Sequence, residues 1–373
     1  MTAIETDGPV PADLRSLTTL RFFAAAWVVL YACWPHLDVA FTPAFVAKGY
    51  LGVETFFILS GFILSHVYLE QAGGRRLDYR GFLWARIARV YPLHLATLLG
   101  VMALGLAATA VGMAIDDKVL SWRTLPAHLL MVHAWGFANE AGWNHPSWSI
   151  SAEWFAYLSF PAFAFVAWRL RGRPIAATAG AASLLVALYL GFEATAGFPL
   201  TTATFAWGAL RIVPCFALGC ALYLIHRRAG LPRPRLIAAM CAAGMVALAS
   251  IGAWDGFIVL LAGGLILALG SLSNARAAWL ASRAGVYLGE ISYAIYMVCV
   301  PWTLLAVNLA ARLTGAEDKL LHPFVWLAVV AGLVPVAAAA HHLIERPARR
   351  ALKSWAIRKH AQGGATKART RLA

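Results

Sequence analysis

Residues 20–36 read LRFFAAAWVVLYACWPH, an apolar run with an arginine near its start and a Pro-His pair at its end. About 20 apolar residues cross the hydrocarbon core of a bilayer, so this stretch and its apolar neighbours predict a membrane-spanning helix. Arg21 lies at one end of that helix, and Ala32 lies eleven residues further on. At a rise of about 1.5 Å per residue the two positions are about 16 Å apart, which places Ala32 near or just beyond mid-membrane.

The composition of the whole chain indicates an integral membrane protein. Of its 373 residues, 61% are hydrophobic and 13% are charged, and the mean hydropathy is +0.69. Soluble proteins have only about 45–50% apolar residues. The formal net charge of +14 would suit nucleic acid, but that partner needs a basic face on a soluble fold. Lysines and arginines instead lie between apolar runs, as the positive-inside rule describes, so we expect no nucleic-acid partner.

Ten apolar runs are long enough to span a bilayer, and they predict an all-α integral membrane domain over residues 17–350. A polar segment, residues 1–16, precedes this domain, and a basic tail, residues 351–373, follows it. A shorter apolar run, Leu125–Phe137, has a proline in its first turn and predicts a re-entrant or interfacial helix. The ten runs are residues 17–38, 50–70, 90–114, 148–170, 174–193, 205–226, 233–252, 255–273, 286–311 and 321–343.

The distribution of lysine and arginine predicts the orientation of the chain. Basic residues gather in the even-numbered connections between the ten runs and in the tail, whereas the odd-numbered connections carry few of them. By the positive-inside rule, both termini are expected in the cytoplasm. The N-terminal segment has no basic stretch before a short apolar core, so we expect no cleaved signal peptide. The tail is expected to be disordered or to lie on the membrane surface.

The cysteines and histidines indicate neither disulfides nor a metal. All five cysteines lie inside apolar stretches and none forms a C-x-x-C pair, so we expect them to be small buried apolar residues. The candidate site residues include no cluster of histidines and carboxylates at coordinating spacing, so we expect no metal cofactor.

Position 32 and two carboxylates, Glu54 and Glu153, are predicted to lie at similar depth in the outer half of the membrane. A carboxylate within a span is costly and usually faces the protein interior or a water-filled cavity, so both acids are candidate catalytic residues. The alternatives are a helix-capping acid for Glu54 and an internal hydrogen bond to a neighbouring span for Glu153. Arg211, at similar depth, is either a functional residue or the partner of one of these acids in a structural ion pair.

Three arginines near the predicted cytoplasmic side indicate an anion site. Arg86 and Arg89 are three residues apart on an amphipathic segment, residues 80–91, and would point two guanidinium groups the same way, which suits a phosphate. Arg21 lies at the inner end of the first span. The alternatives are a snorkelling anchor for Arg21 and an ordinary basic helix on anionic lipid for the other two.

At these positions the chain resembles the membrane-bound acyltransferase family 3. These are ten-span enzymes that modify bacterial surface polysaccharides, lipopolysaccharide O-antigens and other extracytoplasmic or lipid-linked hydroxyl compounds. The family motif of L-R, ten residues and His is similar to Leu20-Arg21 followed by ten residues and Ala32. Other segments that resemble family motifs are residues 52–62, the R-x-x-R pair at 86–89, the S-W-S-I-x-x-E element at 147–153, and residues 291–296 and 343–347.

Two positions depart from the family pattern. Ala32 stands where the family has the histidine taken to be the general base, and Cys299, ahead of Pro301, stands where a second histidine is common. His36 follows Pro35 at the membrane boundary, one turn beyond Ala32, and is not expected to substitute. An isolated loss of this kind is typical of an engineered inactive variant or a natural degenerate member. Loss of general base catalysis typically costs about 10² to 10⁴ in rate.

The resemblance implies an O-acyltransferase of the bacterial cytoplasmic membrane. Acyl-CoA in the cytosol, usually acetyl-CoA, would be the co-substrate, and a hydroxyl of an extracytoplasmic or lipid-linked glycan would be the acceptor. The expected catalytic set is position 32 with Glu153, Glu54 and Arg21, and the expected acyl-CoA ligands are Arg21, Arg86 and Arg89. The expected substrate-binding residues are Trp148, Ser149, Arg211 and Tyr293.

Two other functions fit ten spans with intramembrane carboxylates. A transporter or flippase would more often show repeated halves or helices broken at matching positions, and neither pattern is visible. A non-catalytic membrane partner of polysaccharide synthesis is the second, and the alanine at position 32 keeps it open. Binding of acyl-CoA separates the enzyme from both alternatives.

Overall fold

The computed structural model describes residues 13–112, 119–138, 141–228, 230–274 and 277–356. Within these ranges the regular structure is helical, apart from one isolated β-bridge between Leu37 and Leu321. The predicted all-α fold is confirmed. The expectations for most of the N-terminal segment, the last residues of the third run and most of the tail fall on residues 1–12, 113–114 and 357–373, which lie outside the described ranges.

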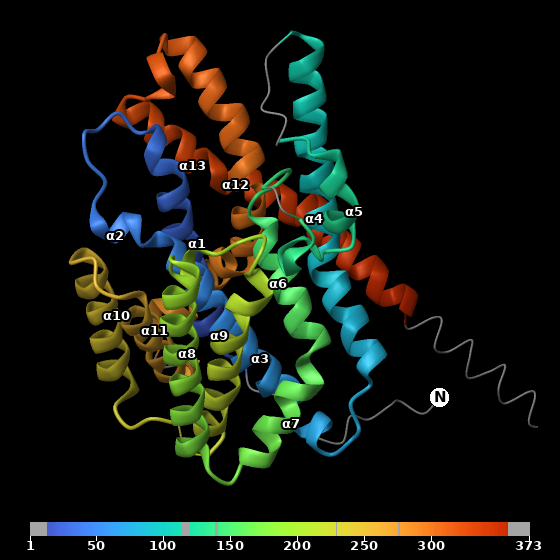
Figure 1. Ribbon diagram of the computed structural model, residues 1–373, viewed down its shortest axis with the longest axis vertical. Helices are drawn as coiled ribbons and strands as arrows, with labels where there is room; N and C mark the ends of the chain where they lie inside the picture. Colours follow the sequence, from blue (N-terminus) through green and yellow to red (C-terminus); the bar gives the residue numbers. More distant parts are fainter. Residues whose placement is uncertain (1–12, 113–118, 139–140, 229, 275–276, 357–373) are drawn as a thin grey trace, which may run out of the picture.

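The helices pack into one bundle (Figure 1), with α3 near its centre. Each of the ten predicted spans corresponds to a helix, and the fourth corresponds to two, α6 and α7. The bounds of the α-helices are α1 Arg15–Cys33, α2 Ala44–Ala47, α3 Gly52–Gly73, α4 Tyr79–Ala110, α5 Leu125–Leu129, α6 Ser147–Leu158, α7 Phe160–Leu170, α8 Pro174–Ala196, α9 Gly208–His226, α10 Pro234–Ser250, α11 Asp255–Gly270, α12 Arg283–Thr314 and α13 Pro323–Ala340.

Seven helices of the described chain are long and apolar enough to cross a membrane: α1, α3, α4, α8, α9, α12, and α13 with its continuation. The pair α6 and α7 forms an eighth if it is one span bent by 58°, with Pro161 in the first turn of α7 unable to continue α6. Helices α10 and α11 have 17 and 16 residues, short of the about 20 that a span needs. Of the ten predicted spans, the described chain therefore has seven or eight that are long and apolar enough to cross a membrane.

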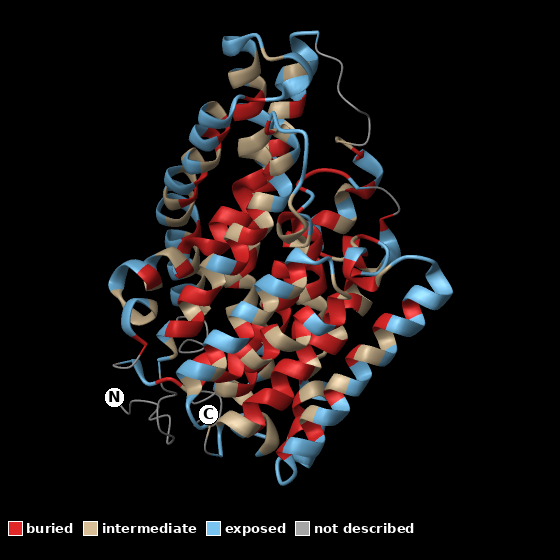
Figure 2. Cartoon of the chain, turned by 90° about the vertical axis from the view of Figure 1, so that its left-hand side faces the viewer, coloured by how far each residue is buried: buried red, intermediate tan, exposed pale blue. Residues whose placement is uncertain are grey.

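Burial is concentrated in the middle of the bundle, and the outer faces of the peripheral helices are exposed (Figure 2). Many of the exposed side chains are large and apolar, such as Phe165, Leu190 and Leu309. A soluble protein seldom exposes so much contiguous apolar surface. These outer faces are suited to contact with lipid, as expected of an integral membrane protein.

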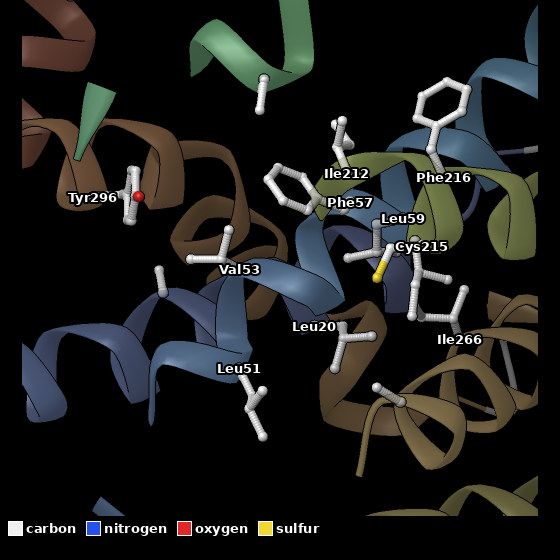
Figure 3. Close-up of a cluster of buried hydrophobic side chains, with 14 of the residues drawn as sticks. Leu20, Leu51, Val53, Phe57, Leu59, Ile212, Cys215, Phe216, Ile266 and Tyr296 are labelled. Carbon is white, nitrogen blue, oxygen red and sulfur yellow. The ribbon is translucent and has the colours of Figure 1, made fainter. Parts of the chain in front are cut away.

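Helices α3 and α9 are in close backbone contact, and this contact depends on two glycines. A Cβ atom on Gly61 would lie 2.2 Å from the Phe216 carbonyl oxygen, and one on Gly219 would lie 2.1 Å from the Ile58 carbonyl oxygen. Only glycine allows two helix backbones to approach so closely. Figure 3 shows the apolar side chains that surround this crossing, among them Phe57, Leu59, Ile212, Cys215 and Phe216.

The predicted re-entrant helix Leu125–Phe137 is not one helix. It forms the five-residue α5 and a separate π-type turn at His133–Phe137, because Met131 and Gly136 have positive φ angles of 55° and 87°. The segment turns inward, and the His128 side chain is fully buried. Burial lowers the pKa of His128 to about 4, so its imidazole is neutral at physiological pH.

Two boundaries differ from the prediction. Helix α4 begins at Tyr79, so the amphipathic segment 80–91 and the third span form one helix that passes through Pro92. After α13 the chain makes a π-type turn at His341–Glu345 and remains helical to Ala356. The first residues of the predicted tail, 351–356, therefore belong to this helix.

The variant Gly219→Ala is expected to lower the free energy of unfolding by about 1–3 kcal/mol, because the new methyl group would press on the Ile58 carbonyl and force α3 away from α9. Gly191→Ala is the matched control, since a Cβ on Gly191 of α8 meets nothing within 4 Å. Thermal unfolding in detergent, followed by circular dichroism, measures the difference. Equal midpoints for the two variants would contradict the tight crossing.

Candidate active site

A cavity of about 240 Å³ lies inside the bundle, bounded by α1, α3, α4, α6 and α12. Its wall is mostly apolar, and three of the lining residues, Val53, Phe57 and Tyr296, are labelled in Figure 3. A concave apolar site with a few convergent polar groups is typical of a ligand-binding site. The polar lining residues are Thr18, Arg21, Ser60, Arg86, Arg89, Ser149, Glu153, Tyr157, Tyr293 and Tyr296.

Glu153 is the one carboxylate among the described residues that line the cavity. The Ser60 hydroxyl on α3 donates a hydrogen bond of 2.7 Å to Glu153 Oε1, and Tyr157, one turn further along α6, also lines the cavity. The internal hydrogen bond considered as an alternative is therefore present, and the carboxylate still lines the cavity. A carboxylate has more lone pairs than this one bond uses, so Glu153 can accept a proton from a bound hydroxyl.

Arg86 is held in an aromatic pocket. Its Cζ atom lies between 5.7 and 5.9 Å from the ring centroids of three residues, and its Nη2 donates a 3.4 Å hydrogen bond to the Tyr68 hydroxyl. Its Nε atom is buried and has no hydrogen-bond partner, so the guanidinium keeps a donor for a ligand. The three rings belong to Tyr68, Phe82 and Tyr157.

Arg21 and Arg89 both line the cavity and lie close enough for their charges to repel. Within the described ranges, neither guanidinium forms an ion pair with a carboxylate. Glu153 and Glu345 are within electrostatic range of Arg21 but do not pair with it. The two guanidinium groups can therefore bind an anion such as a phosphate through charge-assisted hydrogen bonds.

The structure places Glu54 and Arg211 behind the cavity wall. Glu54, in the first turn of α3, accepts hydrogen bonds of 2.5 and 3.0 Å from Arg211 on α9, and both side chains are almost fully buried. Arg211 also donates to the Ala203 carbonyl at 2.7 Å and lies 4.6 Å from the centre of the Trp148 ring. Trp148 in turn packs edge-on against Phe57, which lines the cavity. This arrangement is the structural ion pair considered for Arg211.

The other predicted substrate-binding residues divide into two groups. Ser149 and Tyr293 line the cavity, whereas Trp148 and Arg211 do not. The Tyr293 hydroxyl donates a 2.7 Å hydrogen bond to the Val90 carbonyl of α4, and the Ser149 hydroxyl donates a 3.1 Å hydrogen bond to the Pro146 carbonyl. Tyr293 therefore ties α12 to the arginine-bearing part of α4.

Ala32 is exposed and is absent from the residues that line the cavity. Because α1 is unbroken from Arg15 to Cys33, Ala32 lies three turns beyond Arg21 on the same face of the helix. A larger side chain at this exposed position would not displace buried neighbours. Among the described residues that line the cavity there is no histidine.

The chain matches the family model described as an acyltransferase domain over residues 14–342. It belongs to the acyltransferase family 3. The acyltransferase MdmB of Streptomyces mycarofaciens is 30% identical over 388 residues, which cover 92% of this chain and 94% of that protein. Protein 2 in the picA locus of Rhizobium radiobacter is 44% identical over 52 residues, 14% of this chain and 27% of that protein. No solved structure matches the chain.

In this acyltransferase the two departures from the family pattern lie close together. The sulfur of Cys33, next to Ala32, lies 3.8 Å from the Thr303 hydroxyl oxygen on α12, and this hydroxyl donates a 2.7 Å hydrogen bond to the Cys299 carbonyl. Both thiols are buried. Small apolar groups thus occupy the region where the family pattern has two imidazoles.

Four polar residues that line the cavity were not predicted from the sequence: Thr18, Ser60, Tyr157 and Tyr296. A signal was available for Tyr157, which is four residues after Glu153 and therefore on the same face of a helix. Ser60 and Tyr296 lie inside segments that resemble family motifs, but the resemblance alone does not show which of their residues face a cavity.

The variant Arg211→Met is expected to lower the free energy of unfolding by about 3–5 kcal/mol, because it leaves the buried Glu54 carboxylate without its partner. Adding Glu54→Gln should restore part of the loss, which a double-mutant cycle measures.

The control for this cycle is an exposed ion pair between the same two parts of the bundle, Arg227 and Glu70. Arg227→Met should cost less than about 1 kcal/mol, since solvent screens exposed pairs. A loss at Arg211 no larger than the loss at Arg227 would show that the Glu54–Arg211 pair is not formed as described.

Proposed function

We propose that this acyltransferase transfers an acyl group, with acetyl as the expected group, from cytosolic acyl-CoA to a hydroxyl of an extracytoplasmic or lipid-linked glycan. The observation that carries the proposal is that Arg21, Arg86 and Arg89 share one cavity with Glu153. The arginines supply an anion site and the carboxylate supplies a proton acceptor. The family membership supports the transfer chemistry.

The proposal includes ten spans, with both termini in the cytoplasm of a bacterium and the protein in its cytoplasmic membrane. The distribution of basic residues supports this orientation. Helices α10 and α11 pack against each other and, at about 25 Å each, approach the about 30 Å of the hydrocarbon core. Local thinning of the bilayer would allow both to cross.

Acyl-CoA fits the charge distribution of the site. Its phosphates cannot enter hydrocarbon, so they would bind Arg86 and Arg89 near the start of α4 while the thin pantetheine arm enters the cavity past Arg21. A volume of about 240 Å³ suits the arm and the acyl group, because sites for whole drug-sized ligands measure about 300–1,000 Å³. The thioester would then lie beside Glu153.

The transfer step needs a base and an oxyanion site. The acceptor oxygen attacks the thioester carbonyl, its proton passes to the base, and the C–S bond breaks to release CoA, whose thiolate takes up a proton. Within the cavity Glu153 is the group that can accept this proton, and a cavity arginine would stabilise the developing oxyanion. Because a carboxylate is a weaker base than an imidazole near neutral pH, we propose that turnover is low with alanine at position 32.

The family pattern predicts that Ala32→His raises acetyl transfer or acetyl-CoA hydrolysis by about 10² to 10⁴, whereas the position of Ala32 outside the cavity predicts little change, because the thioester would lie beside Glu153. The purified protein and Ala32→His are compared side by side with acetyl-CoA, and Ala32→Gln is the control because its side chain is of similar size and is not a base. Equal activity of the histidine and glutamine variants would contradict a general base at this position, and proton transfer would then fall to Glu153.

Arg89→Gln is expected to weaken acetyl-CoA binding by about 10- to 100-fold, the loss of one charge-assisted contact to a phosphate. Arg80→Gln is the control, since Arg80 is exposed on the same helix and does not line the cavity. Binding is measured with radiolabelled acetyl-CoA in neutral detergent. Equal affinity of the two variants would remove Arg89 from the donor site.

The second candidate is a non-catalytic membrane partner of polysaccharide synthesis. It is favoured by one observation, the lack of a histidine among the described residues that line the cavity. Such a partner, like a transporter or flippase, would bind no acyl-CoA. Ala32→His would then give no acyl transfer.

A further inference from the structure

The helix that continues α13 crosses α4 beside the arginines of the proposed donor site. In Figure 1 the red end of the chain passes the blue-to-cyan first part of α4. The contact is specific: Trp84 Nε1 on α4 donates a 2.9 Å hydrogen bond to the Leu352 carbonyl, and the Trp84 and Trp355 ring centroids are 5.0 Å apart. These contacts lie on both sides of Lys353 in the sequence and fix this helix against α4.

Two cations of this helix lie near the same arginines. Arg349 and Lys353 are four residues apart, so their side chains leave one face of the helix. Each lies within electrostatic range of both Arg86 and Arg89. Two helices, α4 and the continuation of α13, therefore bring four positive charges together.

Few carboxylates lie near the basic cluster formed by Arg86, Arg89, Arg349 and Lys353. Two carboxylates, Glu345 and Glu290, are within range of Arg349, but Glu345 already binds His341 Nδ1 at 2.9 Å. In the part of the chain that the structure describes, neither Arg349 nor Lys353 forms an ion pair. Like charges at such short range repel one another, and a bound anion would relieve the repulsion.

The positions of the four cations relative to the cavity suggest which part of a ligand each pair binds. Arg86 and Arg89 line the cavity, whereas Arg349 and Lys353 do not and lie outside it. In CoA the pantetheine arm is attached to the diphosphate, and the 3′-phosphate is on the ribose, further from the arm. A phosphate monoester carries about −1.5 to −2 charges at pH 7, so it needs cationic partners of its own.

We propose that Arg349 and Lys353 bind the 3′-phosphate of acyl-CoA, while Arg86 and Arg89 bind the diphosphate. This proposal rests on the proposed function, since it assumes that acyl-CoA is the donor. It assigns a substrate-selecting role to the C-terminal helix, which would distinguish CoA from its dephosphorylated form. An anionic lipid headgroup has related phosphate chemistry and is the other possible source of the anion.

The test compares binding of acetyl-CoA and acetyl-dephospho-CoA to the full chain in neutral detergent without added lipid. The purified protein should bind acetyl-CoA at least about tenfold more tightly, the effect of one charged contact. The double variant Arg349→Gln/Lys353→Gln should lose this preference and keep its affinity for acetyl-dephospho-CoA. Arg346→Gln/Arg350→Gln, an exposed pair with the same spacing and charge loss, should keep the preference.

The outcomes separate the two proposals. If the unaltered protein binds neither ligand, the proposed function fails and this inference fails with it. If it binds acetyl-CoA and the 349/353 variant keeps the 3′-phosphate preference, only this inference is overturned. If that variant keeps the preference but loses anionic lipid in nanodiscs containing phosphatidylglycerol, the cluster is a lipid site. Elution volume on size exclusion and the unfolding midpoint show that the variants are folded.

Discussion

The backbone contact between α3 and α9 at Gly61 and Gly219 determines where the functional side chains of α3 point. It fixes both the depth and the rotation of α3. With α3 held in this way, Ser60 lies beside Glu153 in the cavity and Glu54 lies against Arg211 behind it. A helix turned by one residue, about 100°, would turn Glu54 away from Arg211 and leave a buried carboxylate unpaired.

The interior contains two kinds of charge, and the difference between them suggests which ones bind ligand. Glu54 and Arg211 neutralise each other with two hydrogen bonds, so they can remain buried away from water at modest cost. Arg21 and Arg89 have no such partner within the described ranges, although both line the cavity. A cavity that keeps unpaired guanidinium groups is adapted to an anion, and this is the physical basis for proposing acyl-CoA as the donor.

The bounds of the helices follow from the sequence better than the direction in which each side chain points. Hydropathy predicted the helices, and the motif resemblance predicted that the R-x-x-R pair and Glu153 belong to the site. Both depend on apolar length and residue spacing, which can be read directly from the sequence. Glu54 and Glu153 were expected at similar depth, but Glu153 binds Ser60, which lies six residues, or about 9 Å, further along α3 than Glu54. The two acids also face different surroundings, because rotation about the helix axis is determined by packing partners on other helices.

Packing also explains the other differences between prediction and structure. Positive φ angles at Met131 and Gly136 break the expected re-entrant helix. These backbone angles cannot be predicted from the hydropathy of the segment. The contact of Trp84 with Leu352 joins residues that are 268 positions apart, so nothing local indicates that the start of the tail belongs beside α4. Short helices such as α10 and α11 lie at the limit where hydropathy distinguishes a span from a buried helix.

The central claim is that the cavity between α1, α3, α4, α6 and α12 receives the acyl end of acyl-CoA. Its most direct test is an experimental structure of the protein with a non-hydrolysable acetyl-CoA analogue. The expected density has the diphosphate on Arg86 and Arg89, the pantetheine arm passing Arg21, and the acyl carbon next to Glu153. An analogue bound outside this cavity, with its phosphates away from α4, would contradict the proposed donor site.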